Sequence, residues 1–256
     1  MNPQIFGWQH LTFLAIFAVI TISSLVIIKL YVKNEKLQDI IVYMALLLVL
    51  RCVGALLFVF ILWNRISIAV SNNNGWYLIP DSFCGMSSLV LSLATMFGRR
   101  NNNVLHFVFY FALVGGFITI IYPDFIGQNI SFWYSNTISG LLHHATSFYM
   151  SLLLCLVGWF TPNYKKWPNI IIGFLSYITF GAFLISVLGY DDAFYIMNPI
   201  LSGTPLTVWL LIPIFIAFYI IFMIVYELIK RKMEKKKLSI LVDKENKQED
   251  KNKNSL

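Results

Sequence analysis

Long, uninterrupted blocks of apolar residues make up most of the chain, and the charged residues fall mainly in the short stretches between them. A helix needs about 20 mostly apolar residues to cross the hydrocarbon core of a bilayer. By that measure the pattern predicts an all-α fold, a polytopic transmembrane bundle of about seven spans. The predicted spans are residues 11–28, 38–62, 78–97, 104–122, 137–160, 168–189 and 206–229.

The composition supports this prediction. Of the 256 residues, 58% are hydrophobic and only 12% are charged, whereas soluble domains carry roughly a quarter charged residues. Too few polar side chains remain to cover a water-soluble particle, so a soluble enzyme is excluded. A transmembrane β-barrel would show alternating apolar and polar positions rather than continuous blocks.

Basic residues mark one side of the membrane. They follow the first, third, fifth and seventh blocks, whereas only Arg65 falls in the other connections. The residues concerned are Lys29, Lys33, Lys36, Arg99, Arg100, Lys165, Lys166 and those after residue 229. The positive-inside rule then predicts an outside N-terminus and a cytosolic C-terminus, in a multi-pass protein of the cell membrane. An odd number of spans requires the same orientation.

The sequence predicts two parts, a transmembrane domain over residues 1–229 and a cytosolic tail over residues 230–256. The tail holds 10 of the 19 Lys and Arg residues. Its basic start fits topology anchoring and could also bind anionic lipid. Residues 243–256 are almost free of apolar side chains, which predicts disorder.

Cys52, Cys84 and Cys155 all lie inside apolar blocks, so we expect free thiols rather than disulfides. The sequence has no glycine-rich nucleotide loop and no metal-ligand cysteine cluster. We therefore predict no cofactor and no metal site. The basic tail is read as a topology signal, so no nucleic-acid partner is predicted.

Two predicted spans carry stripes of small and polar residues at helical spacing. The first stripe consists of Cys84, Ser88, Ser92 and Thr95, and the second of Thr137, Gly140, His144, Ser147, Ser151 and Cys155. Both spans run inward from the outside, so at 1.5 Å rise per residue Cys84 and His144 lie at comparable depth. Such stripes are also typical of close helix packing, and a buried Cys is often a small apolar side chain.

The adjacent pair His143 and His144 is harder to explain by packing, because even a neutral imidazole needs hydrogen-bond partners. A thiolate is a strong nucleophile, and a nearby imidazole can take the thiol proton. Cys84, His144 and His143 are therefore the predicted catalytic residues. Ser88 is a candidate oxyanion donor, from its position on the stripe.

Three further residues are predicted to bind substrate. Arg51 carries a permanent charge inside the second span, and it either pairs with an internal carboxylate or contacts a lipid phosphate. Asp81, at the outer end of the third span, would line the same site. His10 lies beside Trp8 at the outer end of the first span, where it either anchors the helix at the interface or contributes to an outward-facing site.

Several short motifs resemble the bacterial YwaF-like integral membrane family over most of residues 5–229. They are Pro80-x-x-x-Cys84, residues 110–116 followed by Tyr122-Pro123-Asp124, His143-His144-Ala145 and the loop from Gly189 to Pro199, with His10 near the N-terminus. That family looks related to a eukaryotic transmembrane acyltransferase that remodels ether phospholipids. It is more distantly similar to membrane lipid-ester hydrolases that use a Thr and a His.

The resemblance implies Cys84 as the nucleophile, His144 as the base, and a phospholipid or lysophospholipid as the substrate. The chain departs from the family at Ser82, where Pro-Leu-His-Leu-Cys is the frequent family sequence. His143 or His10 could substitute for that His.

Two functions from different classes follow. The first is a membrane-embedded lipid acyltransferase or lipid-ester hydrolase that uses Cys84 and His144 in the outer half of the bilayer. The alternative is a non-catalytic small-solute carrier or substrate-binding component, with Arg51, His143 and Asp81 lining a polar cavity. The lack of inverted repeats in an odd-numbered bundle counts against a carrier.

Overall fold

The computed structural model describes residues 4–33, 40–123, 131–200 and 203–253, so Lys36 and Asp124 lie outside the described residues. In this part the chain is helical and contains no strand. Its seven α-helices are α1 (Trp8–Lys33), α2 (Ile40–Ser71), α3 (Phe83–Phe97), α4 (Leu105–Ile121), α5 (Ser135–Leu156), α6 (Pro168–Leu188) and α7 (Val208–Lys253). Two compact units, Met1–Trp209 and Leu210–Leu256, divide the chain.

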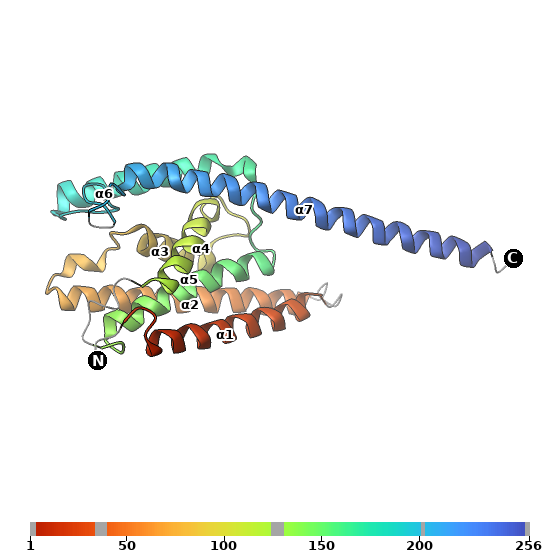
Figure 1. The fold of residues 1–256 in the computed structure, drawn as a ribbon, viewed down its shortest axis with the longest axis horizontal. Coiled ribbons are helices and arrows are strands. Elements are labelled where there is room, and N and C mark those ends of the chain that lie inside the picture. Colours follow the sequence, from red (N-terminus) through yellow and green to blue (C-terminus); the bar gives the residue numbers. More distant parts are fainter. Residues whose placement is uncertain (1–3, 34–39, 124–130, 201–202, 254–256) are drawn as a thin grey trace. The chain divides into compact units, whose positions relative to one another are not determined.

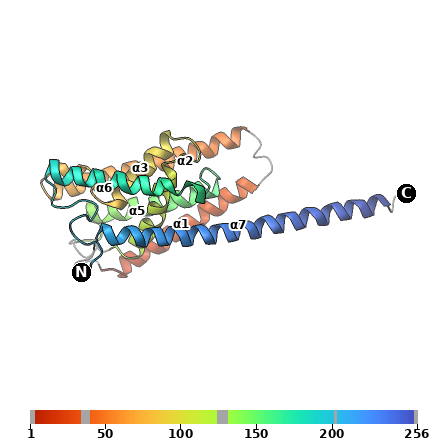
Figure 2. The ribbon, with the colours of Figure 1, turned by 90° about the horizontal axis from the view of Figure 1, so that it is seen from above.

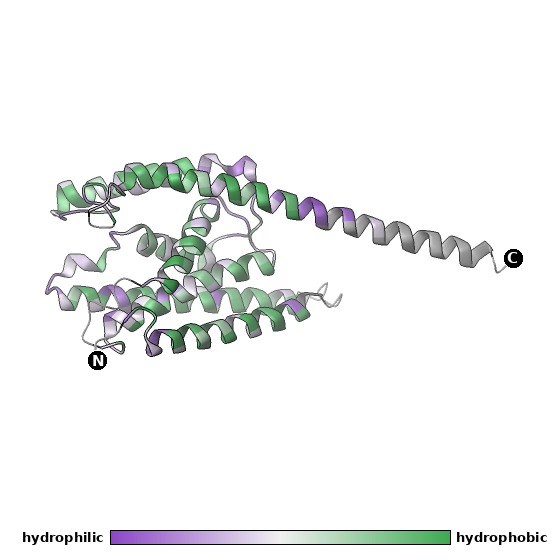
Figure 3. Ribbon diagram, viewed as in Figure 1, coloured by the Kyte–Doolittle hydropathy of each residue, from purple (hydrophilic) through white to green (hydrophobic). Residues whose placement is uncertain are grey.

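Apolar residues cover the helices along most of their length (Figure 3). Four stretches are long and apolar enough to cross a bilayer: Trp8–Leu30, Val42–Ser71, Tyr164–Leu188 and Val208–Lys232. The helices α3 and α4 are shorter, with 15 and 17 residues. A helical integral membrane protein is thereby confirmed, while the number of crossings and their orientation stay predictions.

Within the first unit, α5 packs against α2 and α4, and α3 packs against the same two helices. The helix α1 contacts α5, and α6 contacts α4 (Figures 1 and 2). The polar side chains of α5 therefore face protein rather than lipid. Those that are buried are Thr137, Ser139, His143, His144, Ser147 and Ser151.

Two glycines let the backbone of α4 approach α3 and α5 closely. A Cβ atom built on Gly115 would lie 2.8 Å from the Cys84 sulfur, at the start of α3. A Cβ atom on Gly116 would lie 2.9 Å from the carbonyl oxygen of His144 and 3.1 Å from the backbone nitrogen of Phe148. Because a Gly116 Cβ atom would meet backbone atoms of α5, these atoms cannot move aside as a side chain can.

The ends of α2 and α3 differ from their predicted limits. The helix α2 continues to Ser71, so Arg65 lies in its last turns and not in a loop as the sequence suggested. The helix α3 begins only at Phe83, after a short 3₁₀ turn, η2 (Gly75–Leu78). Ser82 caps α3 by accepting a hydrogen bond from the Gly85 N–H at 3.2 Å.

The second polar stripe is buried over one residue fewer than predicted, since Cys155, in the last turn of α5, is exposed. A second difference concerns the tail. The helix α7 continues through Lys253, so residues 243–253 of the segment predicted to be disordered are helical. Lys and Glu, which are frequent there, are good helix formers.

Replacing Gly116 with Ala should destabilise the first unit, since the added methyl group meets backbone atoms of α5. Overpacking of this kind costs about 1–3 kcal/mol. We expect a clearly lower thermal midpoint for the detergent-solubilised variant than for the wild type. Gly75→Ala is the matched control, because no atom lies within 4 Å of its added Cβ. Equal midpoints for both variants would contradict the close α4–α5 contact.

Candidate functional site

A polar cavity of about 290 Å³ lies where α2, α5 and the start of α3 meet. Of the two polar stripes, only that of α5 reaches it, through Gly140 and His144. Its lining residues are Ile61, Asn64, Arg65 and Ile68 of α2, Ser82 and Gly85 at the start of α3, and Asn136, Gly140, His143 and His144 of α5.

Arg65 holds the segment before α3 at the edge of this cavity. Its Nη1 forms an ion pair with Asp81 at 3.1 Å. Its Nε and Nη2 donate to the carbonyl oxygens of Tyr77 and Ile79 at 2.7 and 2.8 Å. The side chain is only 7% exposed, and three of its five N–H groups are used in this way. The other two make no hydrogen bond to the described residues, and Arg65 lines the cavity.

Asn64 fastens the same end of α2 to α5. Its side-chain nitrogen lies 3.1 Å from both the Asn136 Oδ1 and the Ser139 Oγ. The indole of the preceding residue, Trp63, donates to Ser135 Oγ at 2.8 Å. This seam fixes the two helices that carry most of the cavity wall.

The two histidines of α5 lie next to each other, with ring centroids 3.9 Å apart, and both are buried. The carbonyl of Ser139, one turn earlier, is a polar neighbour of His143. Neither ring nitrogen of His143 has a partner that meets hydrogen-bond geometry among the described residues. A buried imidazole in this state can accept or donate a proton to a molecule that enters the cavity.

Cys84 lies at the level of the histidines but faces α4. Its sulfur lies beside Gly115, and the Thr119 side chain is a polar neighbour. One turn further along α3, Ser88 Oγ meets Ser147 Oγ of α5 at 3.0 Å. Cys84 precedes Ser88 by four residues, and His144 precedes Ser147 by three. Cys84 and His144 therefore each lie about one helical turn from this hydrogen bond, on neighbouring helices. Ser88 itself is therefore engaged with α5.

Arg51 binds the opposite, C-terminal end of α3. Its guanidinium donates to the carbonyl oxygen of Thr95, and to that of Gly98 at 3.1 Å. It also lies over the ring of Trp159, 5.5 Å from the centroid. Asp81, the carboxylate that borders the apolar blocks, pairs with Arg65 instead. The Arg51 cation at the C-terminus of α3 is favourable, because it meets the negative end of the dipole of this helix.

The two arginines of α2 thus hold both ends of α3. They are 14 residues apart, which is about 21 Å along a helix, and the 15 residues of α3 span about 22 Å. The spacing in one helix matches the length of the other.

His10 is fully buried and joins α1 to the end of α4. The Phe6 N–H donates to its Nδ1 at 3.1 Å, so Nε2 carries the proton and donates to the Ile120 carbonyl oxygen at 2.9 Å. It is a link between helices, and it does not line the polar cavity.

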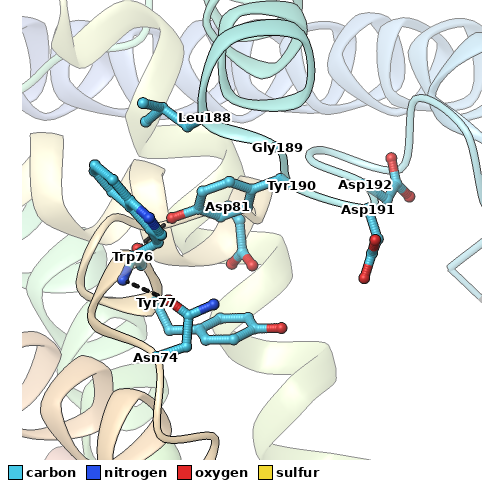
Figure 4. A pocket seen from close by; sticks show the side chains of 9 residues that line it. All are labelled: Asn74, Trp76, Tyr77, Asp81, Leu188, Gly189, Tyr190, Asp191 and Asp192. Carbon is cyan, nitrogen blue, oxygen red and sulfur yellow. Dashed lines mark hydrogen bonds between the residues drawn. The ribbon is translucent and has the colours of Figure 1, made fainter.

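A second, smaller pocket of about 160 Å³ lies on the other side of the Arg65–Asp81 pair. In Figure 4 the Asp81 carboxylate lies between the rings of Tyr77 and Tyr190. Burial and the nearby Asp81 raise the pKa of the Tyr190 hydroxyl above its usual value, so it stays protonated and donates to the Trp76 carbonyl. Asp192, also in the lining, accepts three backbone N–H groups of its own loop.

No group of three or more His, Cys, Asp or Glu side chains in the described part of the chain could hold a metal ion. Comparison with known families gives a single clear result, a match of residues 5–229 to the model of the TMEM164 family. The chain belongs to the TMEM164 family. No curated protein and no solved structure shows significant similarity to it. The matched range of the TMEM164 family contains every residue of the polar cavity.

Sequence reasoning missed Arg65 and Asn64 as lining residues, because both follow the predicted end of the second span. A signal was present, since Ile66, Ile68 and Val70 continue the apolar pattern beyond them. The cavity brings together His143, His144, Asn64 and Arg65, with Asp81 bound to its rim. It does not include Arg51 or His10.

Removing the Arg65 side chain should loosen the segment before α3. Arg65→Met loses the ion pair and two hydrogen bonds from a charged donor, each of the latter worth about 1.5–3 kcal/mol. We expect a lower thermal midpoint and faster proteolysis between residues 72 and 82. Asp81→Asn should cost less, because the bonds to Tyr77 and Ile79 remain. Arg99→Met, at an exposed arginine, is the control, and a loss as large there would refute the assignment.

Proposed function

We propose that the chain is an enzyme of the cell membrane that transfers or hydrolyses the acyl group of a phospholipid or lysophospholipid. Cys84 is the nucleophile and His144 the base. The observation that carries the proposal is the Ser88–Ser147 hydrogen bond, which puts Cys84 and His144 at one level on neighbouring helices. The polar cavity beside them supplies space for an ester group.

The chemistry balances without a cofactor. His144 takes the thiol proton, and the thiolate sulfur of Cys84 attacks the ester carbonyl carbon. The bond from that carbon to the glycerol oxygen breaks, and the imidazolium returns the proton to this oxygen. A second lipid alcohol, or water, then gives its proton to His144 and attacks the thioester, which frees the thiol. The apolar surroundings favour an alcohol over water as acceptor.

Arg65 is the residue we assign to the lipid phosphate, in place of Arg51. The carbonyl oxygens of Thr95 and Gly98 already hold Arg51, at the far end of α3. Arg65 lines the cavity and retains two unused N–H groups, a geometry suited to phosphate oxygens. His143, beside His144, is the second imidazole within reach of a bound head group.

One observation favours a binding component without catalysis. Among the described residues that line the polar cavity, Cys84 does not appear, and its sulfur lies on the α4 side of α3. A protein that only holds a polar molecule between Arg65 and the histidines would need no thiol there.

The deciding experiment compares wild type and Cys84→Ala in detergent, each incubated with a phospholipid and a labelled lysophospholipid. Mass spectrometry should show labelled diacyl product, and an acyl adduct on Cys84, only with the wild type. His144→Ala should lower the rate about 10²–10⁴-fold, the usual contribution of a general base.

Cys52→Ala and Cys155→Ala are the matched controls, because both thiols are exposed. They should retain the wild-type rate. Folded wild-type protein that gives neither product nor adduct would overturn the enzymatic proposal and favour the binding component.

A further inference from the structure

An apolar groove of about 380 Å³ separates α1 from α2 and α5. No charged side chain lines it, and its only polar groups are the hydroxyls of Thr and Ser residues and of one Tyr. The lining residues are Phe13, Ile16, Phe17, Ile20, Thr21 and Ser24 of α1, Val53 and Leu56 of α2, and Leu142, Ala145, Thr146 and Tyr149 of α5. Its volume falls within the usual range of small-molecule sites, about 300–1,000 Å³.

The way α1 is attached leaves this groove open. Over the residues of α1 whose burial is described, Trp8 to Leu30, only His10 and Thr21 are buried. His10 ties the helix to α4 through Ile120. Thr21 is 6% exposed, and its hydroxyl has no hydrogen-bond partner in the described part of the chain. No polar contact of Thr21 therefore draws α1 against α5 at the level of the groove.

The groove and the polar cavity lie along the same two helices, α2 and α5. On α2, Val53 and Asn64 are 11 residues apart, three helical turns, so they lie on one face. On α5, Ala145 of the groove directly follows His144 of the cavity. A molecule with a polar end between Arg65 and the histidines can thus extend an apolar chain into the groove.

We propose that this groove binds the fatty acyl chain of a membrane lipid whose ester group lies at His143 and His144. The position of the ester rests on the proposed function, whereas the chain site rests on the groove itself. Exposed Ile16, Ile20 and Leu56 border the opening between α1 and α2, which faces hydrocarbon in a membrane protein. The chain enters sideways from the bilayer, without leaving an apolar environment.

Photolabelling tests the site directly. The full-length protein is placed in nanodiscs that contain phosphatidylcholine with a diazirine on one acyl chain, irradiated, digested and sequenced by mass spectrometry. We expect label on the groove residues of α1 and α5 at several times the level on exposed residues of α6. Label spread evenly over exposed apolar positions would overturn the proposal.

Matched tryptophan variants separate groove occupancy from general lipid contact. Ile20→Trp and Leu56→Trp fill the groove from exposed positions, so both should fold and lose most of the label. Val19 and Val59 are also exposed, at 64% and 55%, but lie outside the groove lining. Val19→Trp and Val59→Trp should therefore label like the wild type. Unchanged labelling in the first pair would refute the site.

The same experiment distinguishes the two proposals. Labelling does not need the thiol, so Cys84→Ala should label like the wild type. Groove labelling without any acyl transfer would support the acyl-chain site and overturn the enzymatic proposal. Acyl transfer that depends on Cys84 but is unchanged by Ile20→Trp would support the enzymatic proposal and overturn the acyl-chain site.

Discussion

The helix α5 carries six buried Thr, Ser and His side chains along 22 residues, and hydrocarbon offers none of them a hydrogen-bond partner. The helices α1, α2, α3 and α4 surround it. Asn64 of α2, Ser88 of α3 and Gly116 of α4 each meet a different part of its surface. Long apolar helices can face lipid, whereas this one has to be surrounded, and α3 and α4 are the short helices that complete the enclosure.

Much of this could be read from the sequence, because apolar blocks and helical spacing are local properties. The helices, the free thiols and the buried positions of Ser88, Ser92, Thr95 and Ser147 follow from that pattern. The matched level of Cys84 and His144 followed from helical rise alone. Conversely, the stripe does not stay buried at Cys155, which is helical but exposed, because burial depends on which neighbouring helices reach that turn.

The partners of the charged residues could not be read in this way. The sequence suggested that Arg51 pairs with an internal carboxylate or contacts a lipid phosphate, but which arginine reaches Asp81 depends on how far α2 extends and on how α3 lies against it. Asn64 and Arg65 ended the apolar run, yet they remain helical because α5 and the segment before α3 satisfy their polar groups. His10 likewise finds a carbonyl 110 residues away, which no local pattern contains.

The attachment of α3 at its two ends differs in chemical kind. At Phe97 the cation of Arg51 meets uncharged backbone carbonyls. At Phe83 the cation of Arg65 meets the Asp81 carboxylate and two further carbonyls. Replacing this carboxylate with an uncharged side chain would therefore weaken one end of α3 and leave the contacts at the other end unchanged, so that the helix would loosen about its Arg51 end.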